Sequence, residues 1–251
     1  MIDIHSHLLP GVDDGSPTVD VSIPVLRDFA ASGVRTVVCT PHLQASKAAT
    51  APYDRHVEIL ETLRRRAPAG LELALGWEIM LDTPGADLRS PRLALGGSSA
   101  VLVEFSHAGV PPTAGQELFR QRMSGIVPVL AHAERYWGTT PERVEEWRAV
   151  GAVIQVDSAA LHTHGRTQRL AVELLQRGLV DVMASDNHGD SRSLATARDW
   201  LLEMGAGEQA LLLTETNAAR ILANEAPLPV PPLEPRRGMF TRLRALFGGR
   251  S

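Results

Sequence analysis

A His-x-His motif near the start of the chain, His5-Ser6-His7, constrains the fold more than any other feature of the sequence. It extends the short segment Met1-Ile2-Asp3-Ile4, which we interpret as a strand. Side chains two residues apart on a strand point to the same face, so a strand here directs both imidazoles to one point. Converging imidazoles are typical of metal ligands, although a pair of surface or core histidines is the alternative interpretation of an isolated motif.

Six further segments end in an apolar run that is followed at once by His, Asp or Glu. They are residues 37–42, 75–78, 101–104, 129–132, 154–157 and 182–188. In a parallel sheet or barrel the carboxyl ends of the strands meet at one edge, and functional residues belong there. The seven segments together predict that polar side chains with metal-ligand chemistry gather at this edge.

Segments with helical periodicity and recognisable caps separate the predicted strands. We expect helices from Ser16-Pro17 to Gly33 and over residues 140–151, 166–178 and 193–205. Pro24 lies inside the first of these and predicts a kink or a later start. Seven strand and helix units predict a parallel α/β fold, one unit short of the common (β/α)₈ barrel, with an open doubly wound sheet as the alternative.

Length and composition predict one catalytic domain, because 251 residues with 44% hydrophobic content can bury a large core. The net charge of −4 gives no overall attraction for nucleic acid or acidic membranes. Cys39 is the single cysteine, which excludes cysteine-rich zinc sites, and its apolar surroundings favour a core role over a nucleophilic one. The chain shows neither a secretory leader pattern nor a long apolar run, so we expect a soluble, cytoplasmic protein.

The C-terminal residues 226–251 differ in composition from the rest of the chain. Residues 226–235 contain five prolines, which favour an extended linker. Residues 236–251 interleave arginines with Met, Phe and Leu, and on a helix these would form an apolar face opposite a basic one. Such a helix suits peripheral contact with an anionic membrane or a partner, whereas a solvated terminus is the alternative. We therefore expect a domain over residues 1–225, followed by a linker and a basic tail.

Nine imidazoles and carboxylates lie near the predicted strand ends. They are His5, His7, Asp14, His42, Glu78, Glu104, His132, Asp186 and His188. Nine groups are too many for one ion, and a nitrogen and oxygen set without thiolate suits Mn²⁺, Fe or Zn²⁺ better than a soft metal or calcium. Without cations these groups would crowd together at a cost in free energy. Asp14 is the weakest candidate, since Asp-Asp-Gly is also an ordinary turn sequence.

These motifs, in this order, resemble those of the polymerase-and-histidinol-phosphatase (PHP) superfamily. The matching segments are His5-Ser6-His7, Asp13-Asp14-Gly15, Thr40-Pro41-His42, Glu78, Glu104-Phe105-Ser106, and residues 131–136 and 184–188. The resemblance extends from residue 1 to about residue 224. Within the superfamily the chain is most similar to the manganese-dependent protein-tyrosine phosphatases of bacterial capsule and exopolysaccharide loci, since Asp14 and Glu104 stand where related members often have His.

The resemblance implies a distorted (β/α)₇ barrel of the PHP type that holds up to three ions, with Mn²⁺ preferred and Fe or Zn²⁺ as alternatives. It places the first ion between His5, His7, Glu78 and Asp186. It places the second between Glu78, Glu104 and His132, so that Glu78 bridges, and the third between Asp14, His42 and His188.

Phosphate ester hydrolysis is the chemistry that such a site implies, because bound ions activate water and neutralise phosphate charge. Arg135 and Arg192 follow His132 and His188 closely, and a guanidinium can form a forked bond to phosphate. We predict that both arginines bind the phosphate, with ordinary surface arginines as the alternative. Asp3 is a candidate to orient the ligand histidines.

The resemblance implies a phosphatase that acts on phosphotyrosine in the tail of a bacterial tyrosine kinase controlling polysaccharide synthesis. One alternative is a small-molecule phosphomonoesterase on the same barrel, such as histidinol phosphatase. Another is a non-catalytic module that binds phosphorylated partners and keeps metals as structural staples. Of the remaining histidines, His56 is predicted on an exposed helix face, and His107, His162 and His164 in loops near the site.

Overall fold

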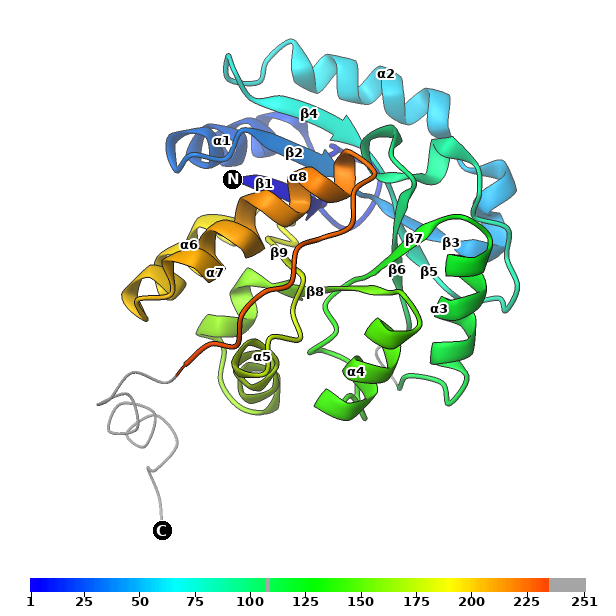
Figure 1. Ribbon diagram of the computed structural model, residues 1–251. Coiled ribbons are helices and arrows are strands. Elements are labelled where there is room, and N and C mark those ends of the chain that lie inside the picture. The colour runs from blue at the N-terminus through cyan, green and yellow to red at the C-terminus, as the bar shows by residue number, and fades with distance from the viewer. Residues whose placement is uncertain (107–108, 235–251) are drawn as a thin grey trace.

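Strands and helices alternate along the chain as predicted, and the computed structural model describes residues 1–106 and 109–234 (Figure 1). The strands are β1 (Ile2–Ser6), β2 (Thr36–Cys39), β3 (His42–Gln44), β4 (Glu72–Leu75), β5 (Glu78–Met80), β6 (Ala100–Glu104), β7 (Val127–Leu130), β8 (Val153–Asp157) and β9 (Val182–Ala184). The α-helices are α1 (Val19–Ala31), α2 (Tyr53–Arg64), α3 (Ala114–Met123), α4 (Pro141–Ala149), α5 (Arg166–Gln176), α6 (Leu194–Glu203), α7 (Gly207–Leu211) and α8 (Asn217–Leu222).

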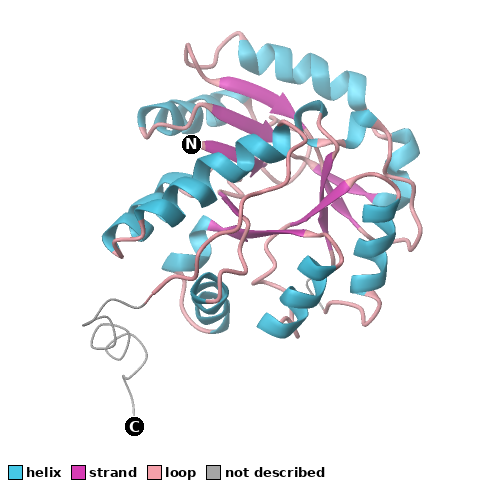
Figure 2. Cartoon of the chain, in the orientation of Figure 1, coloured by secondary structure: helices cyan, strands magenta, loops and turns pink. Residues whose placement is uncertain are grey.

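The strands form two parallel sheets, which confirms the predicted parallel α/β class. One sheet has the order β1-β2-β4 and the other the order β3-β5-β6-β7-β8-β9. A single parallel bridge between Ser6 and Asn187 connects the end of β1 to the chain just after β9. Strands lie at the centre with helices outside them (Figure 2). The strand pairing of the described residues does not form a closed barrel, so the implied (β/α)₇ barrel is not confirmed.

Two of the seven predicted strand segments are each broken into two strands that belong to different sheets. Residues 37–42 become β2 and β3, separated by Thr40 and Pro41. Pro41 has no N–H to donate to a neighbouring strand, which favours a break at this point. Residues 75–78 become β4 and β5, separated by Gly76 and Trp77, and a Cβ at Gly76 would lie 2.7 Å from the Leu95 side chain.

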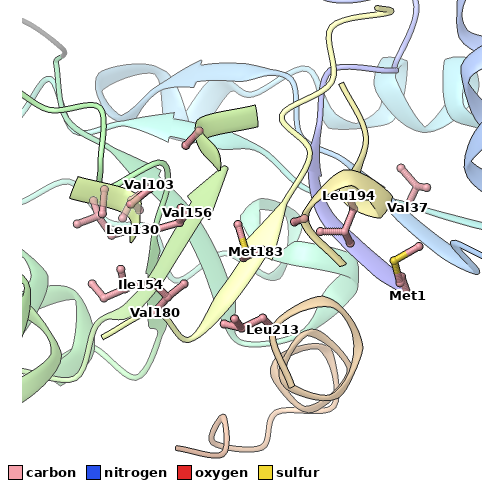
Figure 3. Close-up of a cluster of buried hydrophobic side chains, with 14 of the residues drawn as sticks. Met1, Val37, Val103, Leu130, Ile154, Val156, Val180, Met183, Leu194 and Leu213 are labelled. Atoms are coloured by element: carbon pink, nitrogen blue, oxygen red, sulfur yellow. The ribbon is translucent and has the colours of Figure 1, made fainter. Parts of the chain in front are cut away.

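Alternate residues of the strands pack into two separate apolar clusters, so both faces of the sheets are buried, as parallel sheets require. The larger cluster lies between strands and outer helices (Figure 3), and it includes Val37, Val103, Leu130, Ile154 and Met183. The smaller cluster holds the neighbouring residues Val38, Leu102, Val129, Val153 and Val182, together with Ile4 of β1 and Ala218 and Ile221 of α8. Both sheets therefore contribute to this inner cluster.

Helix ends follow the predicted caps except at the first helix. The Thr140 side chain accepts a hydrogen bond from the Arg143 N–H at the start of α4, and Ser193 caps α6. The first helix begins at Val19 instead of Ser16-Pro17, because the Ser16 backbone is held in a turn by hydrogen bonds to His7 and Gly11. Pro24 lies within α1.

Residues 226–234 of the proline-rich segment pack against the rest of the chain without forming a helix or strand. Val230 and Leu233 are buried, and the Leu233 N–H donates to the Leu175 carbonyl at the end of α5. In Figure 1 this segment runs from α8 toward α5. The predicted basic tail, residues 236–251, and the loop residue His107 lie outside the described residues. Within residues 1–106 and 109–234, every helix is too short or too polar to cross a bilayer.

Candidate metal centre

Along the strand face that forms the inner cluster, the side chains change from apolar to polar at the carboxyl ends of the strands. Glu104 stands two residues after Leu102 of the inner cluster, and Asp157 stands four residues after Val153. Asp186 follows β9 with a backbone φ of 47°. A positive φ is uncommon for a residue other than glycine and is often found at functional sites.

The imidazole of His5 is the centre of the most buried part of this cluster. Its Nε2 atom lies 3.3 Å from His7 Nε2, 3.3 Å from Asp186 Oδ1 and 3.4 Å from Glu78 Oε1. The prediction that His5 and His7 converge is thus confirmed by the distance between their Nε2 atoms. Burial would lower the pKa of His5, but the Glu78 and Asp186 carboxylates overcome this effect and raise it to about 9.

Glu78, at the start of β5, connects this group to the next one. Its Oε1 atom lies 2.6 Å from His132 Nε2, and its Oε2 atom lies 2.9 Å from His42 Nδ1. Glu104 lies 3.7 Å from the same two rings. Burial and the neighbouring Glu78 carboxylate raise the pKa of Glu104 to about 7. Two carboxylates and several imidazoles therefore lie close together and shift one another's protonation.

A third part of the cluster is more exposed to solvent. The Oδ1 atom of Asp14 lies 3.3 Å from His42 Nε2 and 3.6 Å from His188 Nε2. The His188 ring stacks on His7 with 4.1 Å between ring centroids. Asp14 is 69% exposed, so its side chain is free to approach a ligand from the solvent side.

All nine predicted side chains fall into overlapping groups whose candidate ligand atoms lie within 4.8 Å of one another. The groups are His5, His7 and Asp186; His5, Glu78 and His132; His42, Glu78 and Glu104; and His7, Asp14, His42 and His188. The donors are imidazole nitrogens and carboxylate oxygens, which fit divalent cations such as Mn²⁺, Fe²⁺ and Zn²⁺. The arrangement is able to hold more than one ion.

Arg135 and Arg192 border this cluster from the same side. Arg135 Nη2 lies 2.6 Å from Asp186 Oδ2 and also pairs with Asp157, while Arg192 Nη1 lies 3.1 Å from Asp186 Oδ2. The Arg135 and Arg192 side chains are 30% and 26% exposed. Two positively charged side chains therefore lie next to the candidate metal ligands and remain accessible from the solvent.

Two residues that the sequence interpretation did not select contact the candidate ligands. Asp13 Oδ2 lies 2.8 Å from His7 Nδ1, and Gln155 Oε1 lies 3.0 Å from His5 Nδ1. Burial would raise the pKa of Asp13, but its hydrogen bond with His7 lowers it. Asp13 is adjacent to Asp14 in the same turn, whereas the signal for Gln155 is its place on an apolar strand, where an amide is unexpected.

Several other sequence expectations have clear outcomes. Asp3 is buried beside the cluster. It accepts hydrogen bonds from the backbone N–H groups of His5 and Ser185, so it holds the backbone in place and does not orient an imidazole ring. His56 is buried, not exposed as predicted, because α2 packs it against Trp77 with 4.6 Å between rings. Burial raises the pKa of the Cys39 thiol to about 12, in accord with a core role.

The loop histidines do not join the cluster within the described residues. His162 is exposed and approaches the Thr196 carbonyl at 3.4 Å, and His164 is exposed on the same loop. Neither belongs to a group with metal-ligand geometry.

Known proteins resemble the chain over nearly its whole length. The family model "Capsular polysaccharide synthesis, CpsB/CapC" matches residues 1–223. The tyrosine-protein phosphatase YwqE of Bacillus subtilis is 28% identical, with 99% of each chain covered. The tyrosine-protein phosphatase CpsB of Streptococcus pneumoniae is 31% identical, covering 90% of this chain and 99% of that protein.

Solved structures of known proteins also resemble this chain. One from the work on YwqE from Bacillus subtilis and CpsB from Streptococcus pneumoniae, described as unique metal-dependent tyrosine phosphatases, superposes with a TM-score of 0.76 at 26% identity, covering 94% of this chain and 100% of the other. A β-aspartyl dipeptidase of Fervidobacterium islandicum, with a TM-score of 0.57 at 18% identity over 88% of this chain and 72% of that one, shares the fold alone. The chain belongs to the CpsB/CapC family of capsular polysaccharide synthesis proteins.

Proposed function

We propose that this protein is a metal-dependent protein-tyrosine phosphatase that hydrolyses phosphotyrosine. The observation that carries the proposal is the convergence of nine imidazole and carboxylate side chains beside two accessible arginines at one edge of the sheets. Family membership supports the same activity, since relatives that match nearly the whole chain are tyrosine-protein phosphatases.

The nine converging side chains are our proposed metal ligands, distributed over up to three ions with Glu78 as a shared ligand. The first set is His5, His7, Glu78 and Asp186; the second is Glu78, Glu104 and His132; the third is Asp14, His42 and His188. The donors are nitrogen and carboxylate oxygen without sulfur, which fits Mn²⁺, Fe or Zn²⁺. Among these, Mn²⁺ is our preferred ion because the sequence motifs resemble those of manganese-dependent phosphatases. Bound ions would supply activated water and charge neutralisation at the phosphate.

The chain's own residues then bind and orient the phosphoester. Arg135 and Arg192 both pair with Asp186, so their guanidinium groups lie beside the proposed ligands, and both side chains are partly exposed to solvent. A phosphate that enters there meets two forked donors that fix its orientation for in-line attack. The leaving phenolate has a pKa of about 10 in water, so it departs with less help from an acid than an alkyl alcohol needs.

The overall architecture that we infer is the distorted (β/α)₇ barrel of the PHP type. The shared inner cluster supports it, because Ile4 and Val38 of one sheet pack with Leu102, Val129 and Val153 of the other. The bridge between Ser6 and Asn187 closes the gap between β1 and the chain after β9. We divide the chain into this domain, residues 1–225, and a C-terminal linker and basic tail, residues 226–251.

The substrate that we propose is a phosphotyrosine-bearing protein, namely the tail of a bacterial tyrosine kinase that regulates capsule or exopolysaccharide synthesis. The family description supports the link to capsular polysaccharide synthesis. A kinase that phosphorylates such a tail uses ATP as its phosphoryl donor, so we propose that the encounter takes place in the cytoplasm. Residues 236–251 are our candidate for peripheral contact with an anionic membrane beside that kinase.

Turnover measurements test the proposed activity against its main alternative. The protein is stripped with a chelator, reloaded with Mn²⁺, and assayed on a phosphotyrosine peptide and on histidinol phosphate. We expect activity on the peptide that depends on Mn²⁺ and a kcat/KM at least about tenfold above that for histidinol phosphate. A preference of that size for histidinol phosphate would falsify the tyrosine assignment, and metal binding without hydrolysis of either ester would indicate a non-catalytic module.

A further inference from the structure

Gln155 is a buried amide on β8 that contacts both the candidate metal ligands and the candidate phosphate-binding residues. Its side chain is fully buried, and it lies on the same strand face as Asp157, two residues further along. Its Oε1 atom lies 3.0 Å from His5 Nδ1 and 3.0 Å from the backbone nitrogen of His132. Its Nε2 atom lies 2.8 Å from Asp157 Oδ1. A buried amide with three such partners has a defined orientation.

The partners determine which end of the amide is which. The His132 backbone N–H can only donate, so the amide atom facing it must be the oxygen. The carboxylate of Asp157 accepts a hydrogen bond, so the atom facing it must be the amide nitrogen. Because the oxygen also faces His5 Nδ1, that ring nitrogen must carry the proton. When His5 is neutral, as a metal ligand must be, its lone pair therefore lies on Nε2, which faces Glu78 and Asp186.

The other end of the amide reaches the guanidinium of Arg135. Gln155 Nε2 holds Oδ1 of Asp157, and Oδ2 of the same carboxylate pairs with Arg135. Arg135 in turn donates to Asp186 at 2.6 Å. One amide thus lies between a proposed metal ligand and a proposed phosphate-binding residue, and each of its two ends serves one of them.

We propose that Gln155 is a positioning residue that fixes Nε2 of His5 as the metal-binding nitrogen and, through Asp157, directs the Arg135 guanidinium toward the phosphate. The inference rests on the function proposed above. Hydrogen bonds from a ligand histidine to such a partner fix the tautomer and ring orientation, and their loss weakens metal binding about 10–100-fold. Gln155 differs from a simple partner of one histidine because its nitrogen also serves the substrate side.

Two substitutions separate the two ends of the amide. Gln155→Glu keeps an oxygen acceptor for His5 and His132, but it places a second carboxylate against Asp157 and so disturbs Arg135. Gln155→Leu removes both ends at a similar volume. Gln121→Leu is the matched control, because Gln121 is also fully buried and its amide bonds only to Ala86 and Glu117, outside the cluster.

The test combines Mn²⁺ titration calorimetry on the stripped full-length protein with inhibition by inorganic phosphate in the reloaded enzyme. We expect Gln155→Leu to raise the Mn²⁺ dissociation constant about 10–100-fold. Gln155→Glu keeps that constant within about threefold, yet raises the inhibition constant of phosphate about tenfold, because a charged hydrogen bond to phosphate is misdirected. Gln121→Leu changes neither constant.

The inference is overturned if Gln155→Leu binds Mn²⁺ as tightly as the native protein, or if Gln155→Glu loses Mn²⁺ affinity to the same extent as Gln155→Leu. If Gln155→Leu does not fold, Gln155→Glu decides alone, and an unchanged inhibition constant for phosphate overturns the proposal. Failure of the proposed function looks different, since the native protein would then bind no Mn²⁺ or hydrolyse no phosphotyrosine peptide.

Discussion

The two ends of β9 each hold a buried aspartate, and the two side chains differ in what faces them. At the amino end, Asp181 receives Arg148 Nη2 at 2.8 Å and the Ile154 N–H at 2.9 Å, so each of its oxygens has a donor. At the carboxyl end, Asp186 faces His5, His7 and two arginines within one small space.

The difference appears in the titration of the two groups. Burial raises the pKa of Asp181, although its ion pair with Arg148 opposes this. The pKa of Asp186 is lowered, because His5, His7 and Arg135 outweigh the effect of burial. A buried charge with one well-placed partner is a structural element, whereas one that faces several competing groups indicates a site where a ligand rearranges the charges.

The largest expected effect follows from removing the crowded aspartate. Asp186→Ala removes a proposed metal ligand and the common partner of Arg135 and Arg192, and we expect kcat on a phosphotyrosine peptide to fall at least about 10³-fold, the rate equivalent of about 4 kcal/mol. Steady-state turnover with saturating Mn²⁺ measures this. Asp181→Asn is the control at the other end of the strand, and an equal loss of kcat in that variant would contradict the contrast.

A pair of arginines with nearly equal exposure sharpens the comparison. Arg135 and Arg148 are 30% and 29% exposed, and each pairs with a buried aspartate at one end of β9. We expect Arg135→Lys to lower kcat/KM about 10²-fold, because a lysine cannot form the forked bond to phosphate. Arg148→Lys leaves kcat/KM of the folded protein unchanged. Equal kinetics in the two variants would remove Arg135 from the reaction.

The sequence was informative about the carboxyl ends of the strands and less so about how the chain bends. Period and caps predicted the parallel α/β class and the helices α1, α4, α5 and α6, and the caps Thr140 and Ser193 act locally. The breaks at Pro41 and Gly76 depend on which sheet each half of a strand joins, and this is a tertiary choice. His56 was placed wrongly for the same reason, because its burial depends on Trp77, which lies far along the chain.

The candidate site was predictable to the extent that its residues have unmistakable chemistry. Histidines and carboxylates after apolar runs are visible in the sequence, and the structure brings all nine together. Gln155 was missed because an amide has no ligand signature of its own, and its importance depends on His5, which is 150 residues away. Residues that orient others are recognised only when the fold places their partners beside them.

A substitution of Asp181, at the amino end of β9, is expected to lower the stability of the fold without changing the catalytic rate. Asp181→Asn removes a charge that faces Arg148 and weakens the hydrogen bond to the Ile154 N–H. We expect the free energy of unfolding to fall by about 1–3 kcal/mol, toward the lower part of that range because Arg148 is partly exposed to solvent. Urea unfolding measures the change. A variant as stable as the native protein would show that the pair contributes nothing at this end.

The smallest expected effect concerns the pH dependence of the metal-free protein. The pKa of His5 in the folded chain is about 9, above its ordinary value of 6.5, so its stabilising contribution is complete below pH 6.5 and is lost as the pH rises toward 9. Glu104, with a pKa raised to about 7, acts in the same direction, because its neutral form is favoured in the folded chain.

The free energy of unfolding of the chelated protein should therefore fall by roughly 1–2 kcal/mol between pH 7.5 and pH 8.5. Mn²⁺ reverses this trend, because ligands must lose protons to bind it and its binding strengthens as the pH rises. Urea unfolding at both pH values, with chelator and with Mn²⁺, measures the two slopes. Asp181→Asn should show the same pair of slopes as the native protein, because the titrating groups lie at the other end of β9. Parallel slopes with and without Mn²⁺ would mean that the protons and the ion do not compete for the same side chains.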